Sequence, residues 1–112
     1  MRGASVVDFS LFYFANDSGC AEGDRYRLLI DGARFSDEHG FHSIWTPERH
    51  FHNFRGTYPN PSVTSAAIAS ITSRVKIRAG SVAAPLHYPL RIAEEWSVVD
   101  NISHGRVGVS FA

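Results

Sequence analysis

The sequence has one cysteine, no excess of charge of either sign and no long apolar run. With Cys20 as its only cysteine, it has no partner for an internal disulfide and no thiolate cluster for zinc or iron–sulfur binding. Lysine plus arginine equals aspartate plus glutamate, at 11 each, whereas nucleic-acid-binding domains carry a basic excess. No signal-peptide pattern and no apolar stretch near the ~20 residues that span a bilayer are present. We therefore expect a cytoplasmic protein that binds neither nucleic acid, membrane nor metal.

The 112 residues suit one compact domain spanning residues 1–112, with 44% apolar and 20% charged residues. Apolar segments predict strands at 9–15, 42–46, 75–82 and 106–112. Between them, apolar residues at three- and four-residue spacing predict helices. The expected buried faces are Tyr26, Leu29, Ile30 and Ala33 in the first helix, Val63, Ala66, Ala67 and Ile71 in the second, and Ile92, Ala93, Trp96 and Val99 in the third.

Turn and cap residues support these boundaries. Asn60 is a good N-cap, and Pro61 suits the first helical position because its missing N–H costs nothing there. Pro89 opens the third helix in the same way. Gly40 and Gly105 are natural residues for ending the first and third helices.

The predicted order β-α-β-α-β-α-β places the protein in the α/β class with a parallel sheet and right-handed crossovers. Two architectures satisfy this order: a doubly wound open sheet, or part of a (β/α)8 barrel. A dinucleotide-binding sheet carries G-x-G-x-x-G after its first strand. The corresponding turn here is Asn16-Asp17-Ser18-Gly19-Cys20, which lacks that fingerprint.

Residues 45–54, Trp-Thr-Pro-Glu-Arg-His-Phe-His-Asn-Phe, gather an acid, a base and several rings directly behind a predicted strand, where loops often carry chemistry. The residues alone leave alternatives open. Glu48 and Arg49 suit a surface ion pair, which contributes little to stability. His50 and His52 suit a metal pair by spacing, but no cysteine or carboxylate pair stands in matching register.

Three blocks in this order resemble the luciferase-like flavin monooxygenases of the bacterial luciferase superfamily, and most closely those of natural-product biosynthesis. They are Pro47-Glu48-Arg49-His50-Phe51, Gly80-Ser81-Val82-Ala83-Ala84-Pro85 through Pro89, and Ala93-Glu94-Glu95-Trp96-Ser97-Val98-Val99-Asp100-Asn101 leading to Gly105-Arg106-Val107-Gly108. The resemblance implies a (β/α)8 TIM barrel with FMN at the carboxyl ends of the strands. Since a complete barrel needs about 250 residues, it implies that this chain is the N-terminal half, a truncated copy.

The resemblance further implies that reduced FMN and O2 oxygenate an organic substrate, either a small molecule or one bound to a carrier protein. It assigns Glu48, Gly80, Ser81, Val82 and Ser110 to the cofactor site, with a non-proline cis peptide at the bulge after the third strand. Arginine is no general base near neutral pH, and Arg49 replaces the residue credited as the family's base. The acid–base role then belongs to His50, to His52 or to the missing half of the barrel, and His50 is our candidate for proton transfer.

Two alternatives to an FMN-dependent monooxygenase remain open. A related barrel uses the deazaflavin F420 for hydride transfer without oxygen. Alternatively, the chain is a non-catalytic assembly module. Because four strands expose unpaired edges, such a module would complete its barrel with a second chain or by self-association. Among the aromatic residues, we expect Phe9, Phe12, Phe14 and Trp96 in the core, whereas Trp45 suits either the core or a substrate cavity.

Overall fold

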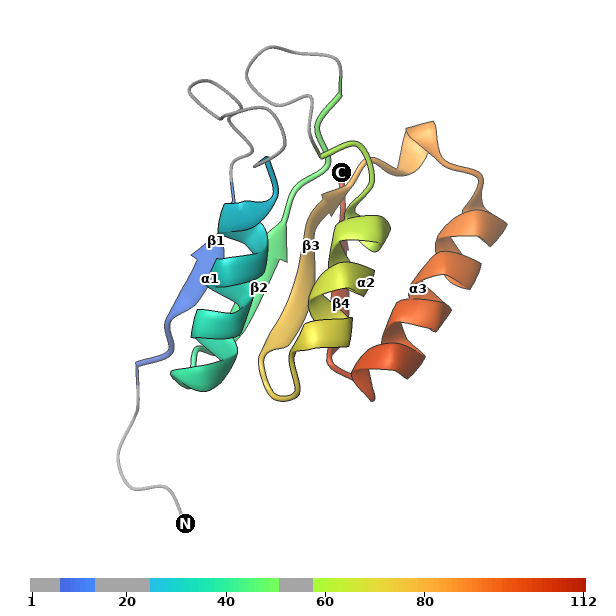
Figure 1. The fold of residues 1–112 in the computed structure, drawn as a ribbon. Coiled ribbons are helices and arrows are strands. Elements are labelled where there is room, and N and C mark those ends of the chain that lie inside the picture. The colour runs from blue at the N-terminus through green and yellow to red at the C-terminus, as the bar shows by residue number, and fades with distance from the viewer. Residues whose placement is uncertain (1–6, 14–24, 51–57) are drawn as a thin grey trace.

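A computed structural model describes residues 7–13, 25–50 and 58–112 of the chain. Strands and helices alternate along it as predicted, with a short 3₁₀ turn before the last helix (Figure 1). The elements are β1 (Ser10–Phe12), α1 (Arg27–Glu38), β2 (Ser43–Thr46), α2 (Pro61–Ile71), β3 (Lys76–Val82), η1 (Ala84–Leu86), α3 (Pro89–Ser103) and β4 (Val107–Phe111).

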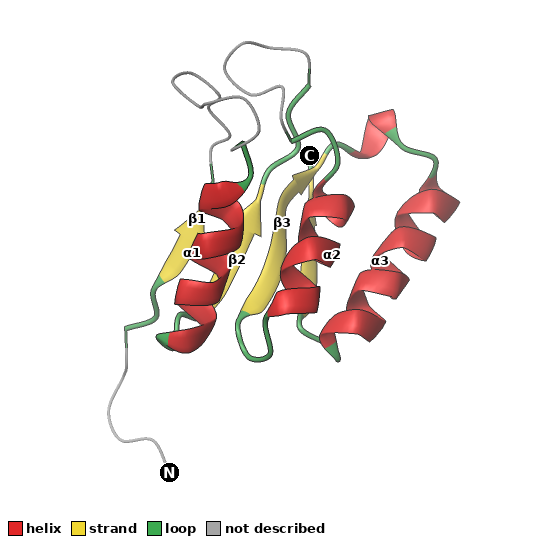
Figure 2. Ribbon diagram, in the orientation of Figure 1, coloured by secondary structure: helices red, strands yellow, loops and turns green. Residues whose placement is uncertain are grey.

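The four strands form one parallel sheet in the order β1-β2-β3-β4. All three helices lie on the same side of it (Figures 1 and 2). Sequential neighbours with helices on one face are the arrangement of a (β/α)8 barrel, in which the other face lines the interior. A doubly wound sheet would instead carry helices on both faces. The structure thus confirms the α/β class and the partial barrel.

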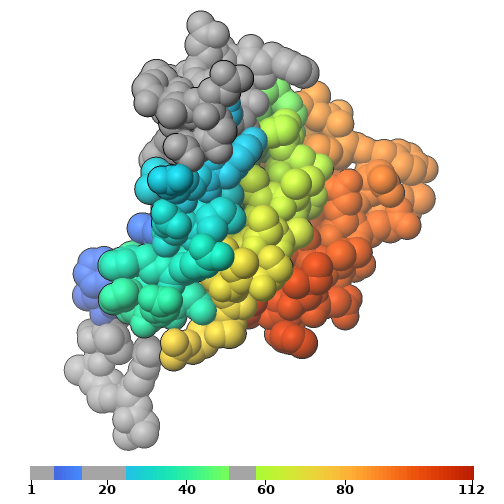
Figure 3. Space-filling model, in the orientation of Figure 1, coloured from blue at the N-terminus to red at the C-terminus, as the bar shows by residue number. Residues whose placement is uncertain are grey.

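The apolar core fills the space between the sheet and the helices. Within the sheet, Ile44, Ile77 and Ala79 have no exposed surface, and neighbouring side chains from the helices cover them. In the space-filling view of Figure 3, α2 lies between α1 and α3 along this outer side. The buried helical residues are Leu29, Ala33, Ile68, Ala69, Trp96 and Val99.

Two charged side chains fix the turn between α2 and β3. The Asp37 carboxylate accepts hydrogen bonds from the backbone N–H groups of Ser73, Arg74 and Val75, at 2.7–3.0 Å. The Arg106 guanidinium donates to the carbonyl oxygens of this turn and of the last turns of α2 and α3. Carbonyl oxygens that the C-terminal ends of α2 and α3 leave unpaired are thereby satisfied, as are the N–H groups of the turn.

The core assignment is wrong for two aromatic residues of the first strand. Phe9 is 66% and Phe12 46% exposed, and of the described residues 9–13 only Ser10–Phe12 form the predicted strand. Because side chains alternate along a strand, Leu11 and Tyr13 face α1, whereas Phe12 faces the side without helices. Trp96, by contrast, is buried as predicted. Phe14 and Cys20 lie outside the described residues.

The buried face of α2 is only partly the one we predicted, because just two of its four residues, Ala66 and Ile71, pack against the core. Val63 is 65% exposed and Ala67 is exposed, while the buried side chains are Pro61, Ser62, Thr64, Ser65, Ile68 and Ala69. The apolar periodicity that predicts this face takes no account of serine and threonine. Here small hydroxyl side chains pack closely against the sheet because their polar atoms are satisfied locally, such as Thr64 Oγ1 by the Pro61 carbonyl. On α3, Ala93 is likewise exposed rather than inward-facing.

The predicted helix ends agree with the structure. The Asn60 side chain accepts a hydrogen bond from the Ser62 N–H at 3.1 Å, as an N-cap does, and Pro61 and Pro89 are first residues of their helices. Gly40 and Gly105 have φ of 73° and 84°, values that favour glycine. No helix in the described ranges combines the length and apolarity needed to cross a membrane.

Candidate active site

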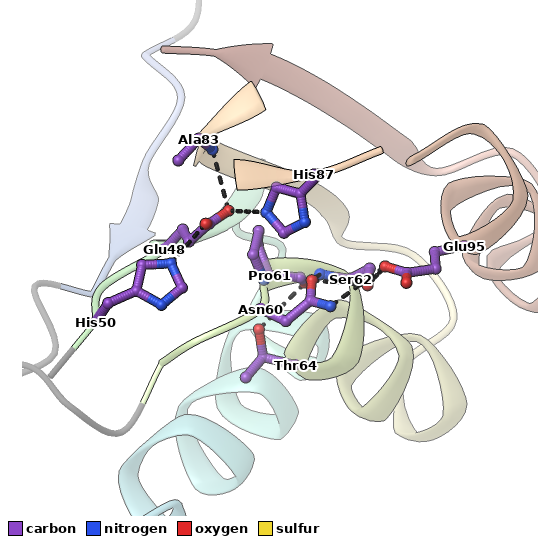
Figure 4. Close-up of polar contacts among 9 residues, drawn as sticks. All are labelled: Glu48, His50, Asn60, Pro61, Ser62, Thr64, Ala83, His87 and Glu95. Atoms are coloured by element: carbon purple, nitrogen blue, oxygen red, sulfur yellow. Dashed lines mark hydrogen bonds and ion pairs between the residues drawn. The ribbon is translucent and has the colours of Figure 1, made fainter. Parts of the chain in front are cut away.

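The buried carboxylate of Glu48 is the centre of a polar cluster at the carboxyl ends of β2 and β3. Its side chain has no exposed surface. Oε2 lies 2.7 Å from His50 Nε2, whereas Oε1 lies 2.8 Å from His87 Nε2 and 3.0 Å from the Ala83 N–H. Figure 4 shows the two imidazoles on opposite sides of the carboxylate. These residues meet because neighbouring parallel strands end at the same edge of a sheet.

These contacts decide the charge of Glu48. Burial disfavours the ionised form, but hydrogen bonds from His50, the Ala83 N–H and His87 outweigh burial and hold the pKa of the Glu48 carboxyl below its usual range. Glu48 is therefore a carboxylate near neutral pH. Both of its oxygens are engaged with residues of this chain.

A second carboxylate, which is half-buried, lies beside the first (Figure 4). Glu95 Oε1 on α3 accepts from Ser62 Oγ at 2.6 Å and from Asn60 Nδ2 at 3.2 Å. The hydrogen bond from Ser62 lowers the pKa of Glu95 most, followed by the one from Asn60, against the opposing effect of burial. Glu95 thereby joins α3 to the first turn of α2, where a negative charge is favoured by the helix dipole.

The end of β3 bulges next to β4. The pairing register shifts between Ala79 and Val82, and the Gly80–Ser81 peptide bond is cis, as the resemblance implied. Ser110 Oγ on β4 donates to the Ala79 carbonyl at 2.7 Å and lies 2.9 Å from Ser81 Oγ. Two hydroxyl groups are thus placed together where the strands end, while Val82 is buried.

An aromatic pair covers the face of the sheet that carries no helices. The rings of Phe12 and Trp45 stack with centroids 5.8 Å apart and an interplanar angle of 14°. Trp45 Nε1 donates to Ser43 Oγ at 3.1 Å. A Cβ at Gly80 would lie 2.9 Å from the Trp45 ring and 3.1 Å from the Phe12 ring. The absence of a side chain at Gly80 therefore allows both rings to lie against the β3 backbone.

A cavity of about 330 Å³ lies on the helical side of the sheet, between α1 and α2. Its lining is almost entirely apolar and consists of Tyr26, Leu29, Ile30, Pro59, Asn60, Val63, Thr64 and Ala67. It contains none of the groups clustered around Glu48. Within the described ranges, no group of three or more histidine, cysteine or acidic side chains is arranged to hold a metal ion.

The predicted site residues form two groups. Glu48 and His50 are in contact, and so are Ser81 and Ser110, with Gly80 and Val82 at the same bulge. The Ala83 N–H connects the bulge to Glu48. Sequence reasoning missed His87, although it lies between the predicted bulge and Pro89, and it assigned no site role to Glu95. His52 lies outside the described residues.

Comparison with known proteins agrees with this geometry. The family model described as luciferase-like monooxygenase matches residues 7–112. The chain belongs to the luciferase-like monooxygenase family. A curated member of this family, the oxygenase component of a flavin-dependent trigonelline monooxygenase from Acinetobacter baylyi, is 37% identical over 87 residues, which are 78% of this chain and 24% of the relative.

Solved structures of luciferase-like monooxygenases superimpose closely on the chain. The monooxygenase RslO1 from Streptomyces bottropensis matches 94% of this chain and 32% of its own, with 33% identity and a TM-score of 0.87. The oxygenating constituent of 3,6-diketocamphane monooxygenase from Pseudomonas putida, solved in complex with FMN, matches 96% of this chain and 29% of its own. Its TM-score is 0.86 at 20% identity, which supports the fold alone.

This luciferase-like chain spans about a quarter to a third of the length of these relatives. In fold terms it supplies four parallel strands of the eight in a (β/α)8 barrel. Activity, substrate and partners of the complete relatives are therefore matters of proposal for this chain.

Proposed function

We propose that this chain forms part of a flavin-dependent monooxygenase that uses reduced FMN and O2 to oxygenate an organic substrate of secondary metabolism. The family match over residues 7–112 carries the proposal. The cluster around Glu48 and the bulge at Gly80–Ser81 support it, because both lie at the carboxyl ends of the strands, where barrel enzymes have their active sites.

The residues at the bulge fit a flat, amphipathic heterocycle. Ser81 and Ser110 provide hydroxyl groups, and the Phe12 and Trp45 rings provide an apolar surface. We assign Gly80, Ser81, Val82 and Ser110 to contact with FMN. Reduced FMN, when bound, supplies the electrons that allow O2 to react with the substrate.

The resemblance also assigns Glu48 to the cofactor site, and direct contact between Glu48 and FMN stays a prediction. Because both of its oxygens already accept hydrogen bonds and its side chain has no exposed surface, we propose that it acts on the site through His50. The His50 side chain is 30% exposed and is the group that we assign to proton transfer.

Titration with oxidised and reduced FMN, followed by difference spectroscopy, tests the cofactor. It compares this chain with a complete barrel that contains it. In the barrel, Ser110→Ala removes one hydroxyl and is expected to weaken FMN binding about 2- to 13-fold, the effect of ~0.5–1.5 kcal/mol. Ser97→Ala is the matched control, because Ser97 is exposed on α3. A barrel that binds no FMN at micromolar concentrations would overturn the proposal, and parallel titration with F420 addresses the deazaflavin alternative.

The barrel needs further strands. In the described part of the chain, β1 and β4 each pair on one side only, and such edges favour association. We propose that additional chain or a second copy pairs there, and that the substrate is a small molecule or an acyl group on a carrier protein. Sedimentation of the chain over a range of concentrations tests self-association, and a mass that stays monomeric throughout argues against a second copy.

A further inference from the structure

His87 has no role in the proposal above, yet it contacts the centre of the site. Its Nε2 lies 2.8 Å from Glu48 Oε1, and its side chain is only 18% exposed. Neither the strand pattern nor the predicted site residues included it. Its position after η1 places it across the Glu48 carboxylate from His50 (Figure 4).

The charge of Glu48 determines where the imidazole protons lie. An ionised carboxylate accepts hydrogen bonds and donates none. At 2.7 and 2.8 Å, His50 and His87 must therefore each donate an N–H from Nε2. A neutral imidazole carries its proton on one nitrogen only, so the lone pair of each neutral ring lies on Nδ1.

We propose that His87 is a positioning residue that, through Glu48, holds His50 in the Nε2–H tautomer and makes Nδ1 the atom at which His50 accepts or releases a proton. The link to catalysis rests on the proposed function, in which His50 transfers a proton. The tautomer itself does not depend on FMN.

The geometry of the carboxylate explains how His87 acts on a ring that it does not touch. His87 and the Ala83 N–H both hold Oε1, which leaves Oε2 directed at His50. Without His87, only the Ala83 N–H fixes Oε1. The carboxylate then rotates more freely, and its preference for the Nε2–H form of His50 weakens.

Other charged groups face this cluster from α3. The Glu95 carboxylate interacts electrostatically with His87. Arg91 Nε lies 4.0 Å from Glu95 Oε2. From the loop after β2, Arg49 adjoins Glu48 in sequence but its side chain is exposed. Glu48 is the hydrogen-bond partner shared by both imidazoles, and as an acceptor it favours the Nε2–H tautomer of each.

Long-range ¹H–¹⁵N correlation spectra of the ¹⁵N-labelled 112-residue chain report the tautomer of each histidine directly. We expect neutral His50 and His87 to be protonated mainly at Nε2. In His87→Leu, the ratio of Nε2–H to Nδ1–H forms of His50 should fall roughly three- to tenfold, because the carboxylate has lost one charge-assisted hydrogen bond. His87→Gln should retain most of the wild-type ratio, since its amide also ends in an N–H donor.

His42→Leu provides the matched control, because the His42 imidazole is exposed and lies in the turn before β2. It should leave the His50 tautomer unchanged. An unchanged His50 ratio in folded His87→Leu overturns the proposal. If that variant does not fold, the wild-type spectrum decides, since a mainly Nδ1–H form of either histidine contradicts the geometry. Failure of the barrel to bind FMN would leave these spectra unaffected, so the two proposals fail separately.

Discussion

Replacing Arg106 by methionine should destabilise the chain more than any other arginine substitution away from the site. All five N–H groups of its guanidinium donate hydrogen bonds: to Ser103 O, to Thr72 Oγ1 and Val75 O, and to Ala69 O and Thr72 O, at 2.7–3.2 Å. Methionine has a similar length and fills the same apolar space, but it has no donor. The substitution therefore isolates the contribution of the hydrogen bonds.

The expected cost follows from counting these bonds. Four of the acceptors are backbone carbonyls at the ends of α2 and α3 and in the turn before β3. Arg106 is half-buried, so water compensates in part, and each bond contributes about 0.5–1 kcal/mol. The five bonds together give roughly 2.5–5 kcal/mol, a large fraction of the 5–15 kcal/mol that stabilises a typical domain.

Urea unfolding followed by circular dichroism measures this difference. With a typical urea dependence of about 1–3 kcal/mol per M, the midpoint of Arg106→Met should fall by roughly 1–5 M. Arg91→Met is the control, because its ion pairs are exposed, 4.0 Å long and worth less than about 1 kcal/mol. Equal midpoints for the two variants would refute the reasoning and show that the hydrated carbonyls are as stable as the bonded ones.

Three other substitutions test separate contacts. Asp37→Asn should lower the free energy of unfolding by about 1–2 kcal/mol at pH 7. Hydrogen bonds from the backbone N–H groups of Val75, Arg74 and Ser73 outweigh burial and lower the pKa of Asp37 in the folded chain. The difference in unfolding free energy between wild type and Asp37→Asn is therefore present above the unfolded-state pKa and should vanish as the pH falls through the folded-state pKa. A difference that does not change with pH in urea unfolding would contradict this prediction. Glu95→Gln should cost about 1–2 kcal/mol in the same assay by weakening the bonds from Ser62 and Asn60, with exposed Glu94→Gln as its control. Gly80→Ala should displace the Trp45 and Phe12 rings, because the new Cβ would lie 2.9 Å from the first and 3.1 Å from the second. We expect this displacement to shift the emission of Trp45, measured in a Trp96→Phe background. An unshifted spectrum would show that the backbone moves instead of the rings.

The order of elements was predictable because it depends on local signals. Apolar strands, the Asn60-Pro61 start of α2 and the glycines with positive φ each act within a few residues of sequence. The orientation of individual side chains was less predictable. Phe12 is apolar and lies in a strand, but it faces the side of the sheet that no helix covers, and nothing local distinguishes that side from the buried one.

The buried face of α2 shows a second limit of sequence patterns. A helix that packs closely against a sheet can do so with serine and threonine, provided that each hydroxyl finds an acceptor. Thr46 on β2 and Ser65 on α2 meet in this way, 3.4 Å apart and both without exposed surface. A count of apolar residues assigns such positions to the solvent, and it therefore selected Val63 and Ala67 instead.

In the cluster around Glu48, sequence reasoning found Glu48 and His50, which lie in one loop, and missed His87, which reaches the carboxylate from another loop. Glu48 and His50 are two residues apart, so their proximity is a local property. His87 is 39 residues from Glu48 and meets it only because β2 and β3 are parallel neighbours that end at one edge. The parallel pairing of β2 and β3 therefore predicts that the segment after β3 lies close to the loop after β2. Partners of Glu48 are accordingly expected among the polar residues of 83–89. His87 is the histidine in that segment, and a buried carboxylate with two oxygens needs more donors than one neighbouring ring provides.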